Sequence, residues 1–462
     1  ESVTLTGATS VTAEISNAND LVSVVLDSEV THIDISANSV ANVLFDIEDL
    51  NNGANPNRTI VNTGSAGSYK IKDTAANLVT GVAFVEDQTV IIDDSSTAAS
   101  TSELNSIQAG IGTGSITWTK LTDTAANLDT NKADIIAGVT ATAVETGAAS
   151  TFATIAQINS LQAQASGAGG GASFVYTKVN DTSSNIVANQ VGGAIQDITG
   201  KTVTVTTNST AAHYELMITA ATSGGASGTV AGDVVDDVAN LDDVTLTGAT
   251  AVVGIISNAN DLTALTLDSE VTHIDISTNS VANVLLDIND LTNRTILNTG
   301  NAGSYKVKDT ATVLAGASSS LLSGQAVVIN DGVTAATTTE LNTIQTSTGG
   351  SGTVTYTKLK GTASDLVTNK ADIVSGVAVT IVETGADSTL ATVAQIEELT
   401  SAVVAAGGGA TLTYTKLHDT ASNLAAGAGS VLSGKTITID ETGGASTYAD
   451  TTELNSIQTK MG

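Results

Sequence analysis

Short stretches of alternating apolar and polar residues recur along the chain, and each is followed by a small-residue segment with helical character. Residues 114–122 (GSITWTKLT) alternate and are rich in β-branched types, which predicts a strand. Asp123 and Thr124 then supply side-chain oxygens suited to capping a helix, and residues 125–128 begin that helix. The pattern therefore predicts strands that alternate with short helices.

A second helix is predicted in each module, because the pattern Ser/Thr-x-x-Glu/Gln of a capping box recurs. The examples are Ser100 with Glu103, Thr154 with Gln157, Thr337 with Glu340 and Thr392 with Gln395. Alternating stretches between the helices predict further strands at residues 139–144, 201–205, 377–382 and 435–439. Glycine-rich turns are expected to close the modules at residues 167–171, 349–352 and 407–409.

The chain repeats itself at two scales. Residues 3–50 match residues 244–291 closely, and a shorter phrase, Lys-apolar-x-Asp-Thr-Ala-x-Asn-Leu, recurs with variations inside each copy. It begins at Lys70, Lys120, Lys178, Lys306, Lys358 and Lys416. Such repetition predicts an α/β repeat protein, an elongated solenoid of strand–short helix coils with a parallel sheet. A parallel β-helix or a tandem of small β-rich domains is the alternative architecture.

The long repeat also predicts how the chain is divided. Residues 1–224 form repeat half 1, and residues 244–462 form half 2, its duplicate. Residues 225–243 are glycine-rich and then acidic, and they have no counterpart in the second copy. We interpret them as a junction between the halves, either a linker or an extra coil.

Composition restricts the partners. The chain of 462 residues has 47 acidic and 16 basic residues and a net charge of −31, so we do not expect nucleic acid as a partner. Aromatic residues make up only 3%, so the core must be aliphatic. Cysteine is absent, which excludes disulfides and cysteine-based metal sites. No apolar run is long enough to predict membrane insertion.

One motif has the form of a phosphate-binding loop, but its context argues against that role. Residues 429–436 satisfy GxxxxGK[ST], a loop that must follow a strand and open a helix. Here the segment follows a predicted helix and leads into a predicted strand. A turn before a strand explains this copy and its counterparts in the repeat.

Acidic clusters are the candidate chemistry, because a calcium ion needs several oxygen ligands. The candidate ligands are Asp27, Glu29, Asp93, Asp94, Asp236, Asp237, Asp268 and Glu270. They fit no known calcium-loop pattern, and the alternative is a solvated acidic face. No other cofactor is indicated.

The recurring Asp, Thr and Asn of the short phrase have a structural explanation. Asp123 and Thr124 are expected to cap a helix, and an Asn such as Asn127 is expected to bond backbone groups in a ladder from coil to coil. No clustered catalytic set is evident, so the sequence does not predict an enzyme.

Three copies of the phrase, KLTDTAANL at Lys120, KIKDTAANL at Lys70 and KLHDTASNL at Lys416, show a resemblance to a known group. They resemble the DTAANL repeats of very large secreted and cell-surface proteins of bacteria, notably cyanobacteria and other aquatic Gram-negative species. The resemblance implies an extracellular component of a surface layer, sheath or filament, or a giant adhesin. It brings no catalytic residues.

Our leading hypothesis is a structural extracellular protein that assembles with copies of itself. The alternative is an adhesin-like scaffold that binds carbohydrate, such as a cell-surface polysaccharide. Residues that break the repeat, namely Trp118, Phe152, Phe174 and Tyr214, distinguish the two. Clustering of these aromatics on one exposed face would favour ligand binding, whereas burial or scatter favours the scaffold. A third hypothesis, a glycosidase or polysaccharide lyase, requires two acids that converge in a groove.

Overall fold

A computed structural model describes most of the chain, and the bounds below refer to that part. The described residues are 7–15, 21–22, 24–35, 43–51, 53, 57–61, 69–242, 244–256, 262–264, 267–277, 284–297, 305–332, 334–442 and 448–462. They divide into two compact units. Unit 1 comprises Glu1–Val234 with Thr245–Thr250, and unit 2 comprises Val235–Val244 with Ala251–Gly462.

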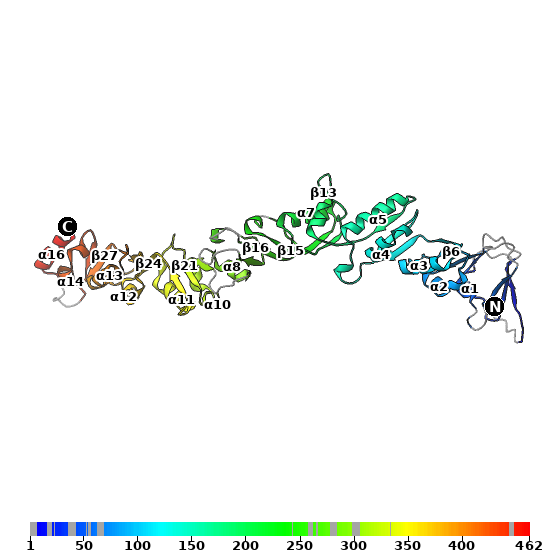
Figure 1. Cartoon of the computed structure of the whole chain (residues 1–462). Coiled ribbons are helices and arrows are strands. Elements are labelled where there is room, and N and C mark those ends of the chain that lie inside the picture. Colours follow the sequence, from blue (N-terminus) through cyan, green and yellow to red (C-terminus); the bar gives the residue numbers. More distant parts are fainter. Residues whose placement is uncertain are drawn as a thin grey trace. The chain divides into compact units, whose positions relative to one another are not determined.

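In unit 1, strands and short helices alternate along the chain (Figure 1). The strands are β1 (Thr12–Glu14), β2 (His32–Asp34), β3 (Leu44–Phe45), β4 (Thr59–Val61), β5 (Lys70–Asp73), β6 (Thr89–Ile92), β7 (Ser115–Thr117), β8 (Lys120–Asp123), β9 (Thr140–Ala143), β10 (Ser173–Val175), β11 (Lys178–Asp181), β12 (Gln190–Val191), β13 (Ala194–Ile195), β14 (Thr202–Val205) and the greater part of β15 (Thr229–Asp237). The α-helices are α1 (Ile47–Leu50), α2 (Ala75–Thr80), α3 (Thr101–Gly110), α4 (Ala125–Thr130), α5 (Ile155–Ala168), α6 (Ser183–Ala188) and α7 (Ala211–Ala221).

Unit 2 follows the same alternation. Its strands are the greater part of β16 (Ala249–Ile255), β17 (His273–Asp275), β18 (Leu285–Leu286), β19 (Thr295–Leu297), β20 (Lys306–Asp309), β21 (Ala326–Ile329), β22 (Ala336–Thr337), β23 (Thr353–Thr355), β24 (Lys358–Gly361), β25 (Ala378–Ile381), β26 (Thr411–Thr413), β27 (Lys416–Asp419) and β28 (Thr436–Ile439). Its α-helices are α8 (Ile288–Asn293), α9 (Ala311–Gly316), α10 (Ser319–Leu322), α11 (Thr338–Thr348), α12 (Ala363–Thr368), α13 (Val393–Ala406), α14 (Ala421–Ala426), α15 (Gly429–Leu432) and α16 (Thr451–Met461).

The sheets are parallel, as expected for strands joined through helices. In unit 1 the neighbours run in the orders β1-β2-β4, β3-β5-β6-β7, β8-β9-β10 and β11-β14-β15. In unit 2 the corresponding orders include β18-β20-β21-β23, β22-β24-β25-β26 and β27-β28. The short hairpin of β12 and β13 is antiparallel. The fold is therefore an α/β arrangement of several parallel sheets, as the fold-class prediction requires.

The strand predicted over residues 114–122 is two strands. It breaks at Trp118 and Thr119 into β7, the last strand of one sheet, and β8, the first strand of the next. A parallel bridge between Ala99 and Leu121 lies just before helix α3. The chain thus passes from one sheet to the next through a two-residue break, which alternation alone does not reveal.

The predicted caps and turns are confirmed. The four predicted capping boxes are present, with both bonds made at the start of α3, α5, α11 and α13. Gly169 and Gly407 follow α5 and α13 with φ of 67° and 65°, a backbone conformation that favours glycine. Residues 429–436 run from helix α15 into strand β28, so they lack the strand–loop–helix context of a phosphate-binding loop.

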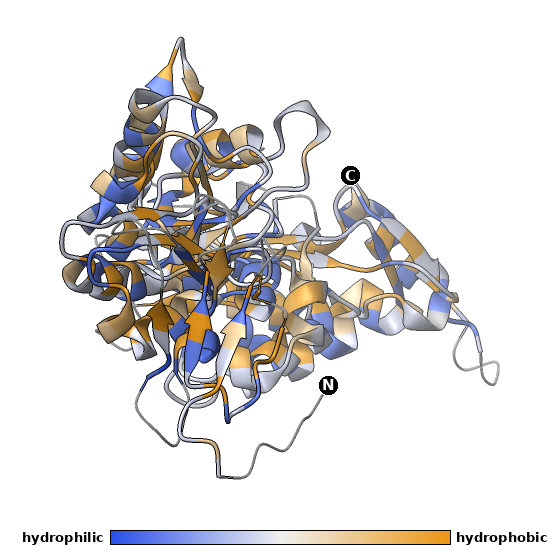
Figure 2. Cartoon of the chain, turned by 90° about the vertical axis from the view of Figure 1, so that its right-hand side faces the viewer, coloured by the Kyte–Doolittle hydropathy of each residue, from blue (hydrophilic) through white to orange (hydrophobic). Residues whose placement is uncertain are grey.

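The core is mainly aliphatic in both units. Each coil contributes an inward residue from its strand and one or two from its helices, such as Leu121, Leu128 and Leu104, all fully buried or nearly so. Figure 2 shows apolar segments alternating with polar ones along strands and helices. Burying thin layers of Val, Ile and Leu between successive elements explains how a chain with so few aromatics can fold.

The predicted junction at residues 225–243 contains regular structure. Strand β15 occupies much of it and pairs with β14, Thr229 lying opposite Thr202. A 3-10 turn at Val238–Asn240 follows directly. Among the described residues, no helix combines the length and apolar character needed to cross a membrane.

Candidate functional site

The recurring Asp of the short phrase joins two successive helices. Asp123 ends strand β8, and its Oδ1 accepts hydrogen bonds from the Thr124 amide and the Asn127 side chain, both at 2.8 Å. Its Oδ2 accepts from the backbone N–H and the hydroxyl of Thr101, the first residue of the preceding helix α3. One carboxylate therefore satisfies donors at the start of both helices, which would otherwise lack partners.

The other copies repeat this arrangement. The amide at the start of the preceding helix donates to Asp73, Asp181 and Asp419 at 2.9–3.0 Å, and to Asp309 at 3.4 Å; the donors are Ile47, Ile155, Val393 and Ile288. The Thr that follows each Asp caps the next helix, as predicted. Where Gly361 replaces the Asp, Thr362 caps α12 alone, which was also predicted.

Hydrogen bonds control the charge of Asp123. Burial by itself would raise the pKa of this carboxyl, but donors from Thr101, Asn127 and Thr124 outweigh burial and hold the pKa below its ordinary value. Asp123 is therefore a charged acceptor, and bonds to a charged acceptor are stronger than bonds between neutral groups.

The role predicted for the recurring Asn is wrong in detail. Asn127 donates to Asp123 in its own coil and does not form a ladder with backbone groups of neighbouring coils. Ladder-like contacts come instead from the second helix of the module. Asn105 donates to Asn131 and Asn342 to Asn369, at 3.0 and 2.9 Å. The sequence could not show which Asn makes the contact between coils, because the Asn of the short phrase and the Asn of the second helix recur with the same period.

A second set of acids holds the start of the next Lys phrase. Glu145 follows strand β9, and its Oε1 accepts from the backbone amides of Thr177 and Lys178 at 2.6 and 2.7 Å. Asp94, Asp331 and Glu383 make the same pair of bonds to the Thr-Lys pairs at 119–120, 357–358 and 415–416. These acids stabilise the break between one sheet and the next.

The Lys of the phrase contributes to the same break. Lys178 Nζ donates to the backbone carbonyl of Glu145 at 3.0 Å and lies 4.7 Å from the centre of the Phe152 ring. Lys120 Nζ donates likewise to the carbonyl of Asp94. Lys358 Nζ donates in the same way to the carbonyl of Gly332, so three copies of the phrase use Lys for a backbone contact with the preceding coil.

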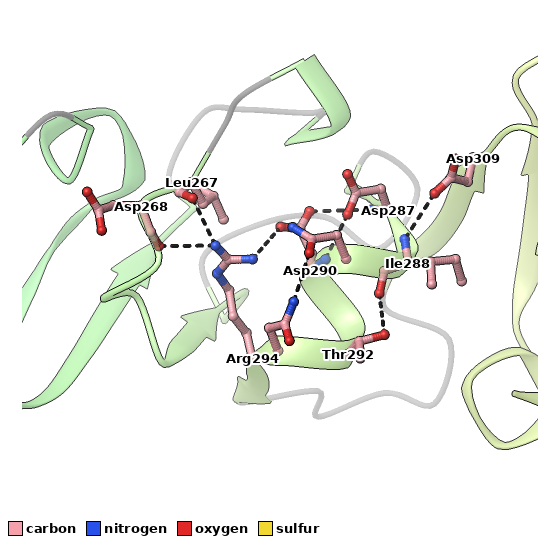
Figure 3. A network of polar contacts seen from close by, with 10 residues as sticks. Leu267, Asp268, Asp287, Ile288, Asp290, Thr292, Arg294 and Asp309 are labelled. Atoms are coloured by element: carbon pink, nitrogen blue, oxygen red, sulfur yellow. Dashed lines mark hydrogen bonds and ion pairs between the residues drawn. The ribbon is translucent and has the colours of Figure 1, made fainter. Parts of the chain in front are cut away.

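The chain has two arginines, Arg58 and Arg294, and both are buried. Arg294 Nη1 donates to Asp290 Oδ1 at 3.0 Å, and Nη2 donates to the carbonyls of Leu267 and Asp268 at 3.0 and 3.1 Å (Figure 3). Arg58, its counterpart in unit 1, donates to backbone carbonyls at similar distances, namely those of Leu26, Asp27, Val30, Glu48 and Asp49. Each guanidinium ties a loop to the start or end of a short helix.

The acids beside the arginines have raised pKa values. Burial, and then the neighbouring charge of Asp287, raises the pKa of Asp290 to about 6, although Arg294 opposes the shift. Burial and Asp46 raise the pKa of Asp49 to about 7 in the same way. Sequence reasoning missed these sites; the signal was that the only two arginines occupy equivalent positions in the long repeat.

Two of the calcium candidates lie beside each arginine. Asp27 Oδ1 accepts from the Glu29 amide at 3.0 Å, and Asp268 Oδ1 accepts from the Glu270 amide at 2.9 Å, so each pair forms a tight turn. The carbonyl of each Asp receives the guanidinium of its arginine. The positive charge next to these turns opposes a second cation there.

The remaining calcium candidates are separate from one another. Asp93 accepts from Ser95 and lies 3.8 Å from Lys72 Nζ, and the bonds from Ser95 lower its pKa. Asp94 accepts from the Thr119–Lys120 amides, as described above. Within the described part of the chain, no three acidic or histidine side chains come together in a way that could hold a metal ion.

Asp236 and Asp237 belong to an additional copy of the short phrase. Asp236 accepts from the Asp237 amide and from the Asn240 side chain at 2.8 and 2.9 Å, as Asp123 accepts from Thr124 and Asn127. Asp237 takes the place of the capping Thr and accepts from the Ala239 amide. The copy escaped recognition because Asp233 stands where the Lys is found elsewhere.

Two of the four aromatic residues that break the repeat are buried, and the other two, Phe152 and Phe174, are half-buried. Trp118 and Tyr214 are buried, with Trp118 Nε1 bonded to the carbonyl of Asp134 and Tyr214 Oη to that of Val230. Phe174 stacks on Tyr176. Comparisons with protein-family models, curated proteins and solved structures give no match for this chain.

Proposed function

We propose that this chain is a structural, non-enzymatic repeat protein whose coils stack as an α/β solenoid and which assembles with copies of itself outside the cell. The observation that carries the proposal is the recurring Asp, which joins the helices of successive coils at Asp73, Asp123, Asp181, Asp309 and Asp419. A polar residue that recurs in most copies of the phrase thus holds one coil to the next.

The surface layer, sheath or filament is the form of assembly that we favour. Stacked coils end in open strand edges, and open edges pair with further strands. A head-to-tail contact that does not close on itself continues as a fibre or a layer. The strong negative charge keeps single chains apart in solution, so cations are expected to promote their association.

The adhesin-like alternative receives less support. A carbohydrate-binding surface would use exposed aromatic residues, but Trp118 and Tyr214 are buried and bonded to backbone carbonyls. Trp118 instead completes the core at the break between β7 and β8, and Tyr214 does so within helix α7. We therefore place carbohydrate binding second, and we propose no enzymatic activity.

Electron microscopy of the purified chain tests the assembly directly. Samples with calcium, with a chelator, and at low and high ionic strength are compared. Filaments or sheets in at least one condition are the expected result, and their loss on chelation would assign calcium to the contacts. Dispersed monomers in all conditions would contradict self-assembly.

A further inference from the structure

A hollow in unit 2 lies between the glycine-rich loop after helix α11 and the 3-10 turn Lys370–Asp372. Its volume is about 390 Å³, and Tyr356, Val354, Val374 and Asp372 are among the residues that line it. None of the lining residues is basic. The hollow therefore combines an aromatic side chain, apolar walls and a carboxylate, a composition typical of a small-molecule site.

The duplicate coil in unit 1 has larger side chains at the same positions. Trp118 stands where unit 2 has Tyr356, and it is buried, with Nε1 bonded to the carbonyl of Asp134. Three neighbours also differ: Ile111, Ile116 and Ile136 of unit 1 correspond to Thr348, Val354 and Val374 of unit 2. All four differences reduce side-chain volume in unit 2, which explains why a hollow lies beside Tyr356.

Two counterparts of Tyr356 in other coils show which group lies on such a ring. Lys201 Nζ lies 4.6 Å from the centre of the Tyr176 ring. Lys435 Nζ lies 4.2 Å from the centre of the Tyr414 ring. Both of these tyrosines are buried, whereas Tyr356 is half-buried. The chain itself thus places an ammonium group over the tyrosine at this position, an attractive arrangement because the ring face is negative.

The coil of Tyr356 has a carboxylate at the ring but no lysine over it. Val377 holds the place of those two lysines, directly before the second strand of the coil. Asp372 Oδ1 accepts from Gln345 Nε2 at 3.0 Å, and Oδ2 accepts no hydrogen bond from the described residues. Tyr356 Oη donates to the Asp372 carbonyl at 2.6 Å, which holds the ring beside the acid. A cation in the hollow would be attracted by the ring and by the carboxylate.

We propose that this hollow binds a primary ammonium group on an alkyl stem, the chemistry that a free alkylamine and a lysine side chain share. The ammonium group would lie over the Tyr356 ring beside Asp372, and the stem would contact Val354 and Val374. The net charge of −31 favours the approach of a cation. The inference is independent of the proposed self-assembly, because all of these residues belong to one chain.

The test is an NMR titration of the isotopically labelled full chain with n-butylammonium at constant ionic strength. The amide signals of Gly350 and Val374 should shift along a saturable curve for one site. 1-Butanol has the same shape without the charge, and it should bind about fivefold or more weakly. A short peptide with one lysine separates the two sources. If it binds as n-butylammonium does, the hollow admits a lysine of another polypeptide; if it does not bind, the ligand is a free amine.

Two substitutions of Tyr356 separate the ring from its hydroxyl group. Tyr356→Leu removes the ring and should weaken n-butylammonium binding about fivefold or more. Tyr356→Phe loses only the bond to the Asp372 carbonyl, and its affinity should stay within about twofold of the unchanged chain, because the ring face is kept.

The carboxylate is tested by a pair of variants with equal net charge. Asp372→Asn should weaken n-butylammonium binding about threefold or more, because the carboxylate no longer attracts the cation. Asp242→Asn changes an exposed acid elsewhere in unit 2 and should leave the affinity unchanged. Equal weakening in both variants would show attraction by the overall charge alone, which would overturn the site.

Three other results would also overturn the inference: no saturable shift with n-butylammonium, equal affinity for 1-butanol, or unchanged binding in Tyr356→Leu. If Tyr356→Leu disturbs the fold of unit 2, the Phe and Asn variants decide. Loss of binding in Tyr356→Phe, or unchanged binding in Asp372→Asn, would then contradict the proposed contacts.

Discussion

Two coils with similar sequences end their first strand differently. Strand β8 ends at Asp123, whereas β24 ends at Gly361. Thr101 and Thr338 begin the preceding helices, and both are buried to 3% exposure. Thr101 donates its amide and its hydroxyl to the Asp123 carboxylate, whereas Gly361 has no side chain that could accept from Thr338.

The fold of the coil is nevertheless the same in both places. Leu121 and Leu128 are buried in the first coil, and Leu359 and Leu366 in the second. Thr362 caps α12 as Thr124 caps α4, accepting from the third amide of its helix at 3.2 Å in each case. The apolar layer and the Thr cap therefore suffice to form a coil, and the Asp adds the polar link to its neighbour.

The largest effects are expected from the apolar layer, and they should be alike in the two coils. Leu128→Ala and Leu366→Ala each remove a fully or nearly fully buried side chain, so each should cost about 2–5 kcal/mol. Local opening is best measured by hydrogen exchange of the whole chain, because two units need not unfold together. If only one of the two substitutions lowered the free energy of local opening, the apolar layers of the two coils would not be equivalent.

Removal of the polar link should have a smaller effect, restricted to one of the coils. Asp123→Ala leaves the donors of Thr101, Thr124 and Asn127 without their acceptor, which should cost about 1–3 kcal/mol. Exchange should accelerate at the start of both α3 and α4. Asp242→Ala, at an exposed Asp, is the control and should have little effect. Faster exchange in α4 alone would mean that Asp123 does not join the two helices.

Acidification should weaken the Asp123 junction and leave the Gly361 junction unchanged. The pKa of Asp123 is lowered in the folded chain, so its contribution is complete above the unfolded value of about 3.9. That contribution is lost as the pH falls through the folded pKa. Protection of the Thr101 amide, followed from pH 6 to pH 2, should decline in this range. An equal decline in protection of the Thr338 amide would mean that a group other than Asp123 causes the pH dependence.

The smallest effect is expected from restoring the missing Asp. Gly361→Asp offers an acceptor to Thr338, which should stabilise the start of α11 by up to about 1 kcal/mol. The gain is limited because the new Cβ would lie 3.3 Å from the Thr338 and Leu366 side chains, a tight contact. Slower exchange of the Thr338 amide is the expected result. Faster exchange would show that the contact outweighs the bond.

Local features of the fold could be predicted from the sequence because their causes lie within a few residues. The capping boxes at Ser100 and Thr154 need only four consecutive residues, and the glycine turn after α5 needs only Gly169. The break at Trp118 and Thr119 could not be predicted. It depends on Asp94, which lies in the preceding coil and binds the Thr119 and Lys120 amides.

The same reason explains what was missed in the polar sites. Asp123 was predicted to cap one helix, but its partner Thr101 comes from the preceding coil and is close only after the strands have paired. Asp236 was considered a calcium candidate because its copy of the phrase has Asp233 in place of the Lys and Asp237 in place of the Thr, so it was not recognised as a repeat. Arg58 and Arg294 are buried because loops bring carbonyls that are distant in the sequence to each guanidinium, and the sequence does not reveal these loops.

The most direct test of coil-to-coil bonding needs no substitution. Hydrogen-exchange rates of the Thr101 and Thr338 amides are measured in the unchanged chain and corrected for their intrinsic rates. The bond to Asp123 predicts that Thr101 exchanges about tenfold more slowly, the factor that corresponds to about 1.4 kcal/mol. Equal rates at the two amides would contradict the claim that the recurring Asp holds successive coils together.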